Sequence, residues 1–344
     1  MERVVVGMSG GIDSFVTAML LREQGYEVVG VTLQLWEKND LTQVRDLCDK
    51  INIPLFLKEG RSLFRHTVVE PFVESYLRGL TPSPCCMCNR LVKWKLLQEV
   101  ADEYGAKYIA TGHYVRIACL NGKYYIRKGI DPQKDQSYFL WGVSQEILKR
   151  ALTPLGDYTK AQVKEWAGKN GYVQLADKPE SMGVCFLQKK DYRAFVQQNT
   201  TAVCLPGKIV GPTGKVLGEH AGLLNYTIGQ KRGIPSEDGE IFYVREIDTE
   251  NNVILVAPRA ALFTGSILVE RVQVVSKEDL WASDVEIKIR GLGLNPRGYV
   301  RIEELDECRL RVYLPEPAWA VAPGQPVAFY RGDILLGGGI AGKD

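Results

Sequence analysis

The stretch Met8-Ser-Gly-Gly-Ile-Asp-Ser14 follows an apolar run at residues 4–6 and precedes an amphipathic run at residues 15–21. This order predicts a β-strand, a tight glycine turn and the start of a helix. Two adjacent glycines permit positive φ angles and let the backbone approach a ligand closely. The N–H groups of the loop and the positive end of the helix then make a site for an anion. A strand-to-helix turn with only a polar cap is the alternative interpretation.

Asp13 is the unexpected residue of this loop, because a carboxylate repels a bound phosphate unless a cation lies between them. We therefore expect Asp13 to contact Mg²⁺ or an ordered N–H group of the loop. Ser9 and Ser14 can add hydroxyl donors. The loop differs from a Walker A motif, since no Gly-Lys-Ser/Thr follows, and it lacks the three glycines of a dinucleotide fingerprint.

The bulk composition bounds the class of protein. At 344 residues, 45% of them hydrophobic and 24% charged, the chain is typical of a soluble protein of two or three domains. A net charge of +2 neither proves nor excludes nucleic-acid binding, which depends on local patches. The N-terminus lacks a signal-peptide pattern and no run of about 20 apolar residues occurs, so we expect a cytoplasmic protein without a membrane partner. In a reducing compartment such as the cytoplasm, eight cysteines indicate catalysis, metal binding or burial rather than structural disulfides.

Strand and helix patterns alternate over the first 115 residues or so. The predicted strands are 4–8, 27–35, 54–57 and 107–110, and the predicted helices are 15–23, 41–51, 62–80 (interrupted by Pro71) and 91–104. Near-continuous apolar strands between helices predict a parallel sheet covered on both faces, with ligands at the carboxyl ends of its strands. The 9–14 loop and the turn Thr111-Gly-His113 both follow strands. We therefore expect them to face one another across a nucleotide.

The pattern changes from about residue 204 to short strands between turn residues, which indicates one or two small β-barrels. The expected strands are 207–210, 241–247, 253–257, 265–275, 285–289, 308–313 and 326–331. Before that point, Asn121-Gly122 predicts a hairpin, and Thr159 predicts the N-cap of a helix at 160–169. The expected organisation is an α/β domain at 1–203, a small β-rich central domain at 204–268 and a C-terminal β-barrel at 269–344.

A cluster of cysteines follows Pro84. Cys85, Cys86 and Cys88 lie just before the predicted helix at 91–104, where the helix N-terminus, Arg90 and Lys93 are expected to lower thiol pKa values. The Cys85-x-x-Cys88 spacing also suits a metal. Another cysteine, Cys185, lies in a predicted loop. Although most cysteines are simply buried, their loop positions favour a chemical role for Cys88 and Cys185.

These motifs together resemble the tRNA-specific 2-thiouridylase (MnmA/TrmU) family, in the PP-loop ATP pyrophosphatase superfamily, over essentially the whole chain. The matching stretches are Gly7–Ser14, Cys88-Asn-x-x-x-Lys93-Trp94, Ala110–Tyr114, Lys134–Leu140, Ser181–Phe186, Gly222–Gly233, Pro323–Gln325 and Leu336–Ile340. The resemblance implies ATP and Mg²⁺ as cofactors and adenylation of O2 of the wobble uridine of tRNA. Sulfur from a donor, a cysteine desulfurase or a relay protein, then replaces that oxygen.

The resemblance also implies roles for single residues. Cys88 would be the nucleophile or resolving cysteine, and Cys185 would carry the persulfide. ATP would contact Gly7, Met8, Ser9, Gly10, Gly11, Ile12, Asp13, Ser14, Leu33 and Gly112. The tRNA would contact Ser83, Pro84, Cys85, His113, Lys134, Asp135, Gln136, Arg290 and Gln325.

Two departures from the family pattern matter. Ser83-Pro84-Cys85 stands where the family commonly has Asn-Pro-Asp, and Gly291 stands where an aromatic residue usually follows the arginine. Three thiolates, Cys85, Cys88 and Cys185, would suit a [4Fe–4S] cluster with one open iron. A persulfide route and a cluster route both stay open at this point. Outside the family, another PP-loop ligase or amidotransferase without sulfur transfer is the alternative, but such chemistry needs no cysteine pair.

Overall fold

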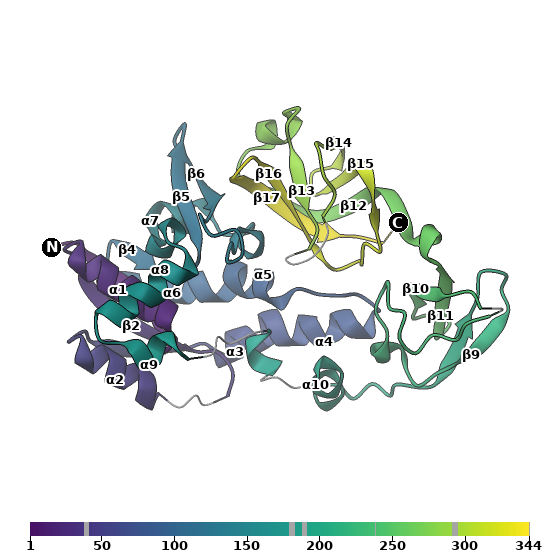
Figure 1. The fold of residues 1–344 in the computed structure, drawn as a ribbon, viewed down its shortest axis with the longest axis horizontal. Helices are drawn as coiled ribbons and strands as arrows, with labels where there is room; N and C mark the ends of the chain where they lie inside the picture. The colour runs from purple at the N-terminus through teal and green to yellow at the C-terminus, as the bar shows by residue number, and fades with distance from the viewer. Residues whose placement is uncertain (38–40, 179–182, 188–190, 238, 291–294, 344) are drawn as a thin grey trace.

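The computed structural model describes residues 1–37, 41–178, 183–187, 191–237, 239–290 and 295–343 (Figure 1). Its N-terminal sheet has five parallel strands in the order β3-β2-β1-β4-β7. They are β1 (Arg3–Gly7), β2 (Glu27–Gln34), β3 (Leu55–Glu59), β4 (Tyr108–Ala110) and β7 (Ala151–Leu152). The predicted parallel sheet is confirmed.

Helices cover both faces of this sheet. Val4 and Val6 of β1 pack with α1 (Ile12–Glu23), α2 (Thr42–Lys50), α8 (Lys160–Lys169) and α9 (Val173–Ala176). Val5, which points the opposite way, packs with α6 (Trp94–Glu103) and α7 (Gln145–Arg150). The predicted cap of α8 is confirmed: Thr159 and Gln162 form a reciprocal capping box.

Two predicted helices differ from the structure, each at a proline. The helix at 62–80 runs from α3 (Arg61–Phe64) through a π-helical turn (Arg65–Val69) into α4 (Glu70–Leu77). Pro71 lies in the first turn of α4, and the wider turn before it accommodates a residue that has no N–H to donate. The helix predicted from residue 91 starts earlier, with α5 (Pro84–Cys88), a π-helical turn (Asn89–Lys93) and then α6. Proline fits the first helical position, and Pro84 begins this helix.

The β-rich part forms two further sheets. The central sheet has the order β10-β11-β8-β9, with β8 (Gly207–Val210), β9 (Val216–His220), β10 (Phe242–Asp248) and β11 (Val253–Pro258). It is joined to the N-terminal domain through α10 (Tyr192–Gln198). The barrel sheet contains β12 (Phe263–Val274), β13 (Glu286–Lys288), β14 (Arg301–Asp306), β15 (Arg309–Trp319), β16 (Pro326–Arg331) and β17 (Ile334–Ala341). The predicted boundary at 268/269 would cut through β12, so we propose that the barrel begins at Phe263.

The N-terminal domain and the barrel share a sheet. The predicted Asn121-Gly122 hairpin is confirmed as β5 (Val115–Leu120) and β6 (Lys123–Lys128), and β6 pairs with β17. At this joint the Asp333 carboxylate accepts from Arg116 and Arg127, at 2.9 and 2.6 Å. The barrel is thereby fixed beside α5 and α6 (Figure 1). Among the described residues, no helix is both long and apolar enough to cross a membrane.

Candidate active site

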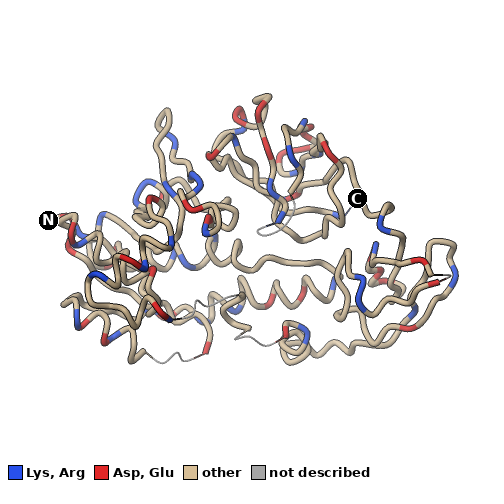
Figure 2. The backbone as a smooth tube through the Cα atoms, viewed as in Figure 1, with Lys and Arg blue, Asp and Glu red and all other residues tan. Residues whose placement is uncertain are grey.

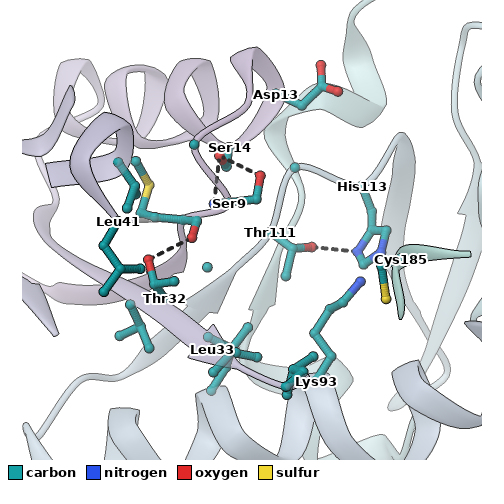
Figure 3. A pocket seen from close by; sticks show the side chains of 18 of the residues that line it. Ser9, Asp13, Ser14, Thr32, Leu33, Leu41, Lys93, Thr111, His113 and Cys185 are labelled. Carbon is teal, nitrogen blue, oxygen red and sulfur yellow. Dashed lines mark hydrogen bonds between the residues drawn. The ribbon is translucent and has the colours of Figure 1, made fainter. Parts of the chain in front are cut away.

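A cavity of about 680 Å³ lies at the carboxyl ends of β1, β2 and β4. Its walls include the 8–10 loop, Asp13, Ser14, Leu33, the Thr111–His113 turn, Lys93, Gln136 and Cys185 (Figure 3). The prediction that the loop and the turn share one site is confirmed. Gly11 and Ile12 do not line the cavity, and Ile12 is buried in the core beneath the loop.

The loop is held by its own hydroxyl groups. Ser14 donates its Oγ–H to the Gly11 carbonyl at 3.0 Å and accepts from the Ser9 N–H at 3.2 Å. Gly10 has a φ of 76°, the positive value that the glycine pair predicted. The result is a preformed turn at the N-terminus of α1 that faces the cavity, as an anion site requires.

Asp13 is bound by protein groups that the sequence did not indicate. Its two carboxylate oxygens accept from Nζ of Lys160 at 2.7 and 2.9 Å, and the Tyr114 hydroxyl donates to it at 2.7 Å. The carboxylate points away from Ser9 and Ser14 (Figure 3). The expectation of a loop N–H partner is therefore wrong, and the cation beside Asp13 is an ammonium. Lys160 is 147 residues away in sequence and was missed, because a lysine at the start of a helix gives no sign of so distant a partner.

Gly112 packs directly against the loop. A Cβ atom at position 112 would lie 2.9 Å from the Asp13 carbonyl carbon and 3.1 Å from its Cβ, so the backbone of one segment would have to move. We expect Gly112→Ala to weaken ATP binding about tenfold or more, measured by calorimetry. Gly168→Ala is the matched control, because a Cβ there meets nothing within 4 Å. That change in α8 should raise stability slightly and leave ATP affinity unaltered; equal ATP affinity in both variants would contradict the argument.

Lys93 brings a positive charge to the other side of the cavity. It is the only lysine or arginine among the described lining residues, and its Nζ points toward His113 and Cys185 (Figure 3). His113 is buried, accepts or donates one hydrogen bond at 2.8 Å with the Thr111 hydroxyl, and stacks on Trp94. Burial first, and then Lys93, hold the pKa of His113 well below its ordinary value. His113 is therefore neutral, and it lines the cavity, where a bound group can contact it.

The cysteines that follow Pro84 lie within a helix and not in a loop before it. Cys85 and Cys88 belong to α5, and burial raises the pKa of both thiols, that of Cys88 to about 11, although Lys93 acts in the opposite direction. The predicted lowering of these pKa values is wrong because desolvation outweighs the helix and the ammonium. Cys185, at the start of a 3₁₀ turn, is exposed, and its charge influences both of the others. All eight cysteines are free thiols.

The pH dependence of Cys88 alkylation tests this account. With a pKa of about 11, its thiolate fraction is small at neutral pH, so its rate with iodoacetamide should rise about tenfold per pH unit from pH 7 to 10. Lys93→Met should slow Cys88 further by removing the nearby positive charge. Cys48, a core thiol whose pKa burial also raises to about 11, should not respond to Lys93→Met. A Cys88 rate that is flat across this range, read by peptide mass spectrometry, would contradict the raised pKa.

Comparison with known proteins gives matches over nearly the whole chain. Three family models match in order: the tRNA methyl transferase HUP domain at residues 2–189, the tRNA methyl transferase PRC-barrel domain at 193–258 and the aminomethyltransferase beta-barrel domain at 264–341. The tRNA-specific 2-thiouridylase MnmA 2 of Phocaeicola vulgatus is 41% identical over 345 residues, covering 98% of this chain and 97% of that protein. The tRNA-specific 2-thiouridylase MnmA of Carboxydothermus hydrogenoformans is 39% identical, covering 99% and 98%.

The chain belongs to the tRNA-specific 2-thiouridylase family. The order of its domains agrees with the three family models: a HUP domain with a parallel sheet, then a PRC-barrel domain and a β-barrel. The third family model begins at residue 264, close to the start of β12, in agreement with a barrel that begins near Phe263.

The residues that the 2-thiouridylase resemblance linked to tRNA fall into two groups. His113 and Gln136 line the cavity, and Gln136 also accepts the Tyr114 N–H at 3.0 Å. Ser83, Pro84 and Cys85 lie at the start of α5, and Lys134 lies in a partly buried turn. These positions are compatible with a bound substrate.

The other three residues linked to tRNA, Asp135, Gln325 and Arg290, form hydrogen bonds within the protein. The Asp135 side chain is 6% exposed and accepts from the Ser137 hydroxyl at 2.8 Å, so it stabilises a turn. Gln325 donates to the Thr81 carbonyl at 2.8 Å, and Arg290 donates to the carbonyls of Trp319 and Ala320 at 2.7 Å. Substitution of Arg290 would therefore disturb the barrel as well as any contact with RNA. Gly291, the departure beside it, lies outside the described residues.

Proposed function

We propose that this chain catalyses the ATP-dependent 2-thiolation of the wobble uridine of tRNA, as a tRNA-uridine 2-sulfurtransferase. The observation that carries the proposal is one cavity with a phosphate-type loop on one side and Cys185 with Lys93 on the other. An activating nucleotide and a sulfur carrier would thus reach the same substrate atom. The similarity to two tRNA-specific 2-thiouridylases supports this substrate and this reaction.

The first step would be activation of the base. The carbonyl oxygen O2 is a poor leaving group, so the uridine attacks the α-phosphorus of ATP through O2, and pyrophosphate leaves. The N–H group of Gly10, the positive N-terminal end of α1 and the Lys93 ammonium stabilise the negative charge that develops on the phosphates. The base must leave the anticodon stack to enter the cavity, where neutral His113 can offer a hydrogen bond to it.

The second step would be sulfur transfer. The terminal sulfur of a persulfide on Cys185 attacks C2, and AMP leaves with the former O2. The Cys88 thiolate then attacks Sγ of Cys185, which forms a Cys88–Cys185 disulfide and releases the 2-thiouridine. A thiol reductant and a new persulfide from the donor, a cysteine desulfurase or a relay protein, would restore the enzyme. If Cys88 attacks first, the same disulfide forms and sulfide is the nucleophile.

Mg²⁺ and a [4Fe–4S] cluster fit the residues of this site differently. Mg²⁺ would be held mainly by the phosphates of ATP, where it would neutralise charge; Asp13 is the only carboxylate among the described lining residues, and Lys160 already occupies it. For a [4Fe–4S] cluster, no three His, Cys, Asp or Glu side chains in the described ranges are grouped as ligands. The residues do not fit the cluster as they stand, so we favour the persulfide route.

A reconstituted reaction tests the proposal. Purified protein, unmodified tRNA, ATP, Mg²⁺ and a cysteine desulfurase with cysteine should yield 2-thiouridine at the wobble position, detected by nucleoside mass spectrometry. Omission of ATP should abolish the product. ATP turnover with tRNA but no sulfur incorporation would instead support a PP-loop ligase or amidotransferase.

A further inference from the structure

A glutamine from outside the loop at residues 9–14 is bonded to the backbone of that loop. Gln43 lies in the first turn of α2, and its side-chain Nε2 donates to the Gly10 carbonyl at 2.7 Å. Both residues line the nucleotide cavity, although they are 33 positions apart in sequence. α2 also packs on the loop, since a Cβ at Gly10 would lie 3.7 Å from Cβ of Val44. The bond therefore joins two separate elements of the cavity wall.

The carbonyl that Gln43 binds belongs to the least restrained residue of the loop. Ser14 holds the residues on either side of it, through the Ser9 N–H and the Gly11 carbonyl. Gly10 has a φ of 76°, and a glycine adopts positive and negative φ with similar ease, so its peptide can turn over at little cost. The carbonyl and N–H of one trans peptide point in opposite directions, so a turn reverses the dipole near a bound phosphate. The Gln43 amide fixes one orientation.

The other end of the Gln43 amide is bound as well. Lys178, which follows α9, donates from Nζ to Oε1 of Gln43. An ammonium can only donate and a backbone carbonyl can only accept, so the two partners leave one orientation for the amide. Hydrogen bonds in such a chain polarise and strengthen one another, and a charged donor strengthens them further. Lys178, Gln43 and Gly10 thus form a relay that ends at the loop.

The position of Lys178 indicates how it acts. Its side chain is exposed, and it does not line the cavity, so it reaches the loop through Gln43. Basic and acidic positions are intermixed over the N-terminal domain (Figure 2), and a single charge in such surroundings acts mainly through its own contacts. The relay also differs from the Lys160 contact, which holds Asp13 in the first turn of α1.

We propose that Gln43 is a positioning residue of the nucleotide site and that Lys178 acts through it. The relay holds the Gly10 carbonyl in one orientation, so the loop is already arranged for the phosphates of ATP before ATP binds. An ordered loop loses less conformational freedom on binding, and this gain is realised only by a ligand that contacts the loop. The inference rests on the proposed use of ATP. It predicts an effect on the phosphates of the nucleotide and none on adenosine, which has no phosphate.

Calorimetric titration of the full-length protein tests the relay, with MgATP and, separately, with adenosine, in the absence of tRNA. Gln43→Met keeps the length of the side chain but removes the donor, and it should weaken ATP binding about tenfold while adenosine affinity stays the same. Lys178→Met should weaken ATP binding less, by about threefold, because the Gln43 bond to the loop remains. Gln174→Met is the matched control: this glutamine of α9 is exposed and does not line the cavity, so both affinities should be unaltered.

The double variant separates an indirect role of Lys178 from a direct one. Gln43→Met/Lys178→Met should bind ATP no more weakly than Gln43→Met alone. Additive losses would place Lys178 on the phosphates and overturn the relay. Unchanged ATP affinity in Gln43→Met would overturn it too, and so would equal losses for ATP and adenosine, which indicate a general change of the cavity. If wild type binds ATP but forms no 2-thiouridine, the proposed function fails alone; if wild type binds no ATP, both fail.

Discussion

Cys185→Ser should lower the formation of 2-thiouridine by at least about 10³-fold, while tRNA-dependent release of pyrophosphate continues. A hydroxyl cannot carry a persulfide, whereas the loop proposed to bind the phosphates lies on the opposite side of the cavity. The Cys185 side chain is exposed, so serine in its place should not affect folding. Nucleoside mass spectrometry and a pyrophosphate assay on the same samples measure the two steps separately. Loss of both activities would mean that Cys185 acts before sulfur transfer.

The neighbouring cysteines make this experiment decisive between the two sulfur routes. Cys88→Ser should also stop thiolation, since both routes need it. Cys85→Ser should retain most activity if a persulfide is used, because Cys85 is then a bystander. Cys86→Ser is the internal control: its buried Sγ faces the Tyr138 carbonyl at 3.8 Å, away from Cys88. The variants should be assayed anaerobically, with iron counted in each.

The outcomes differ clearly. An iron-free wild type that thiolates tRNA from a persulfide donor would exclude the cluster. A dead, iron-free Cys85→Ser beside an active, iron-containing wild type would overturn the persulfide route, because serine is a far poorer ligand for iron than a thiolate.

The sequence predicts well what depends on local patterns. Apolar strands between helices were enough for the parallel sheet, Asn121-Gly122 for the hairpin, and Thr159 for the start of α8. The anion loop and the 111–113 turn could be placed together because parallel strands end on one edge of the sheet. Each of these features needs only neighbouring residues or a rule of topology.

What the sequence did not predict depends on distant contacts and on burial. Nothing local indicates that β6 extends the barrel sheet through β17, or that Lys160 is the partner of Asp13. The predicted lowering of the thiol pKa values was also wrong because burial is not visible in the local sequence. A helix start and a nearby lysine are visible in the sequence, but the packing of Cys88 among Phe64 and Phe186 is not, and burial has the larger effect.

Replacement of either Asp13 or Lys160 should abolish pyrophosphate release. The two replacements should, however, lower the stability of the fold by different amounts. Asp13→Ala removes the carboxylate that pairs with the Lys160 ammonium, whose side chain is 9% exposed, and loss of one partner of a buried ion pair costs about 3 kcal/mol. Lys160→Met keeps the apolar stem and leaves Asp13, whose side chain is 35% exposed, accessible to water and to the Tyr114 hydroxyl. The stability cost should therefore be smaller.

The two losses of activity would have different causes. Without Lys160, the unneutralised Asp13 carboxylate repels the phosphates at the neighbouring loop; without Asp13, the first turn of α1 loses the contacts that hold it against Lys160 and Tyr114. The double variant Asp13→Asn/Lys160→Met should recover stability but not activity, because it removes both charges together. Denaturant unfolding and pyrophosphate release measure the two effects. Wild-type pyrophosphate release by Lys160→Met would show that Asp13 needs no cation from the protein, and Mg²⁺ would then be the cation that allows a carboxylate beside the phosphate loop.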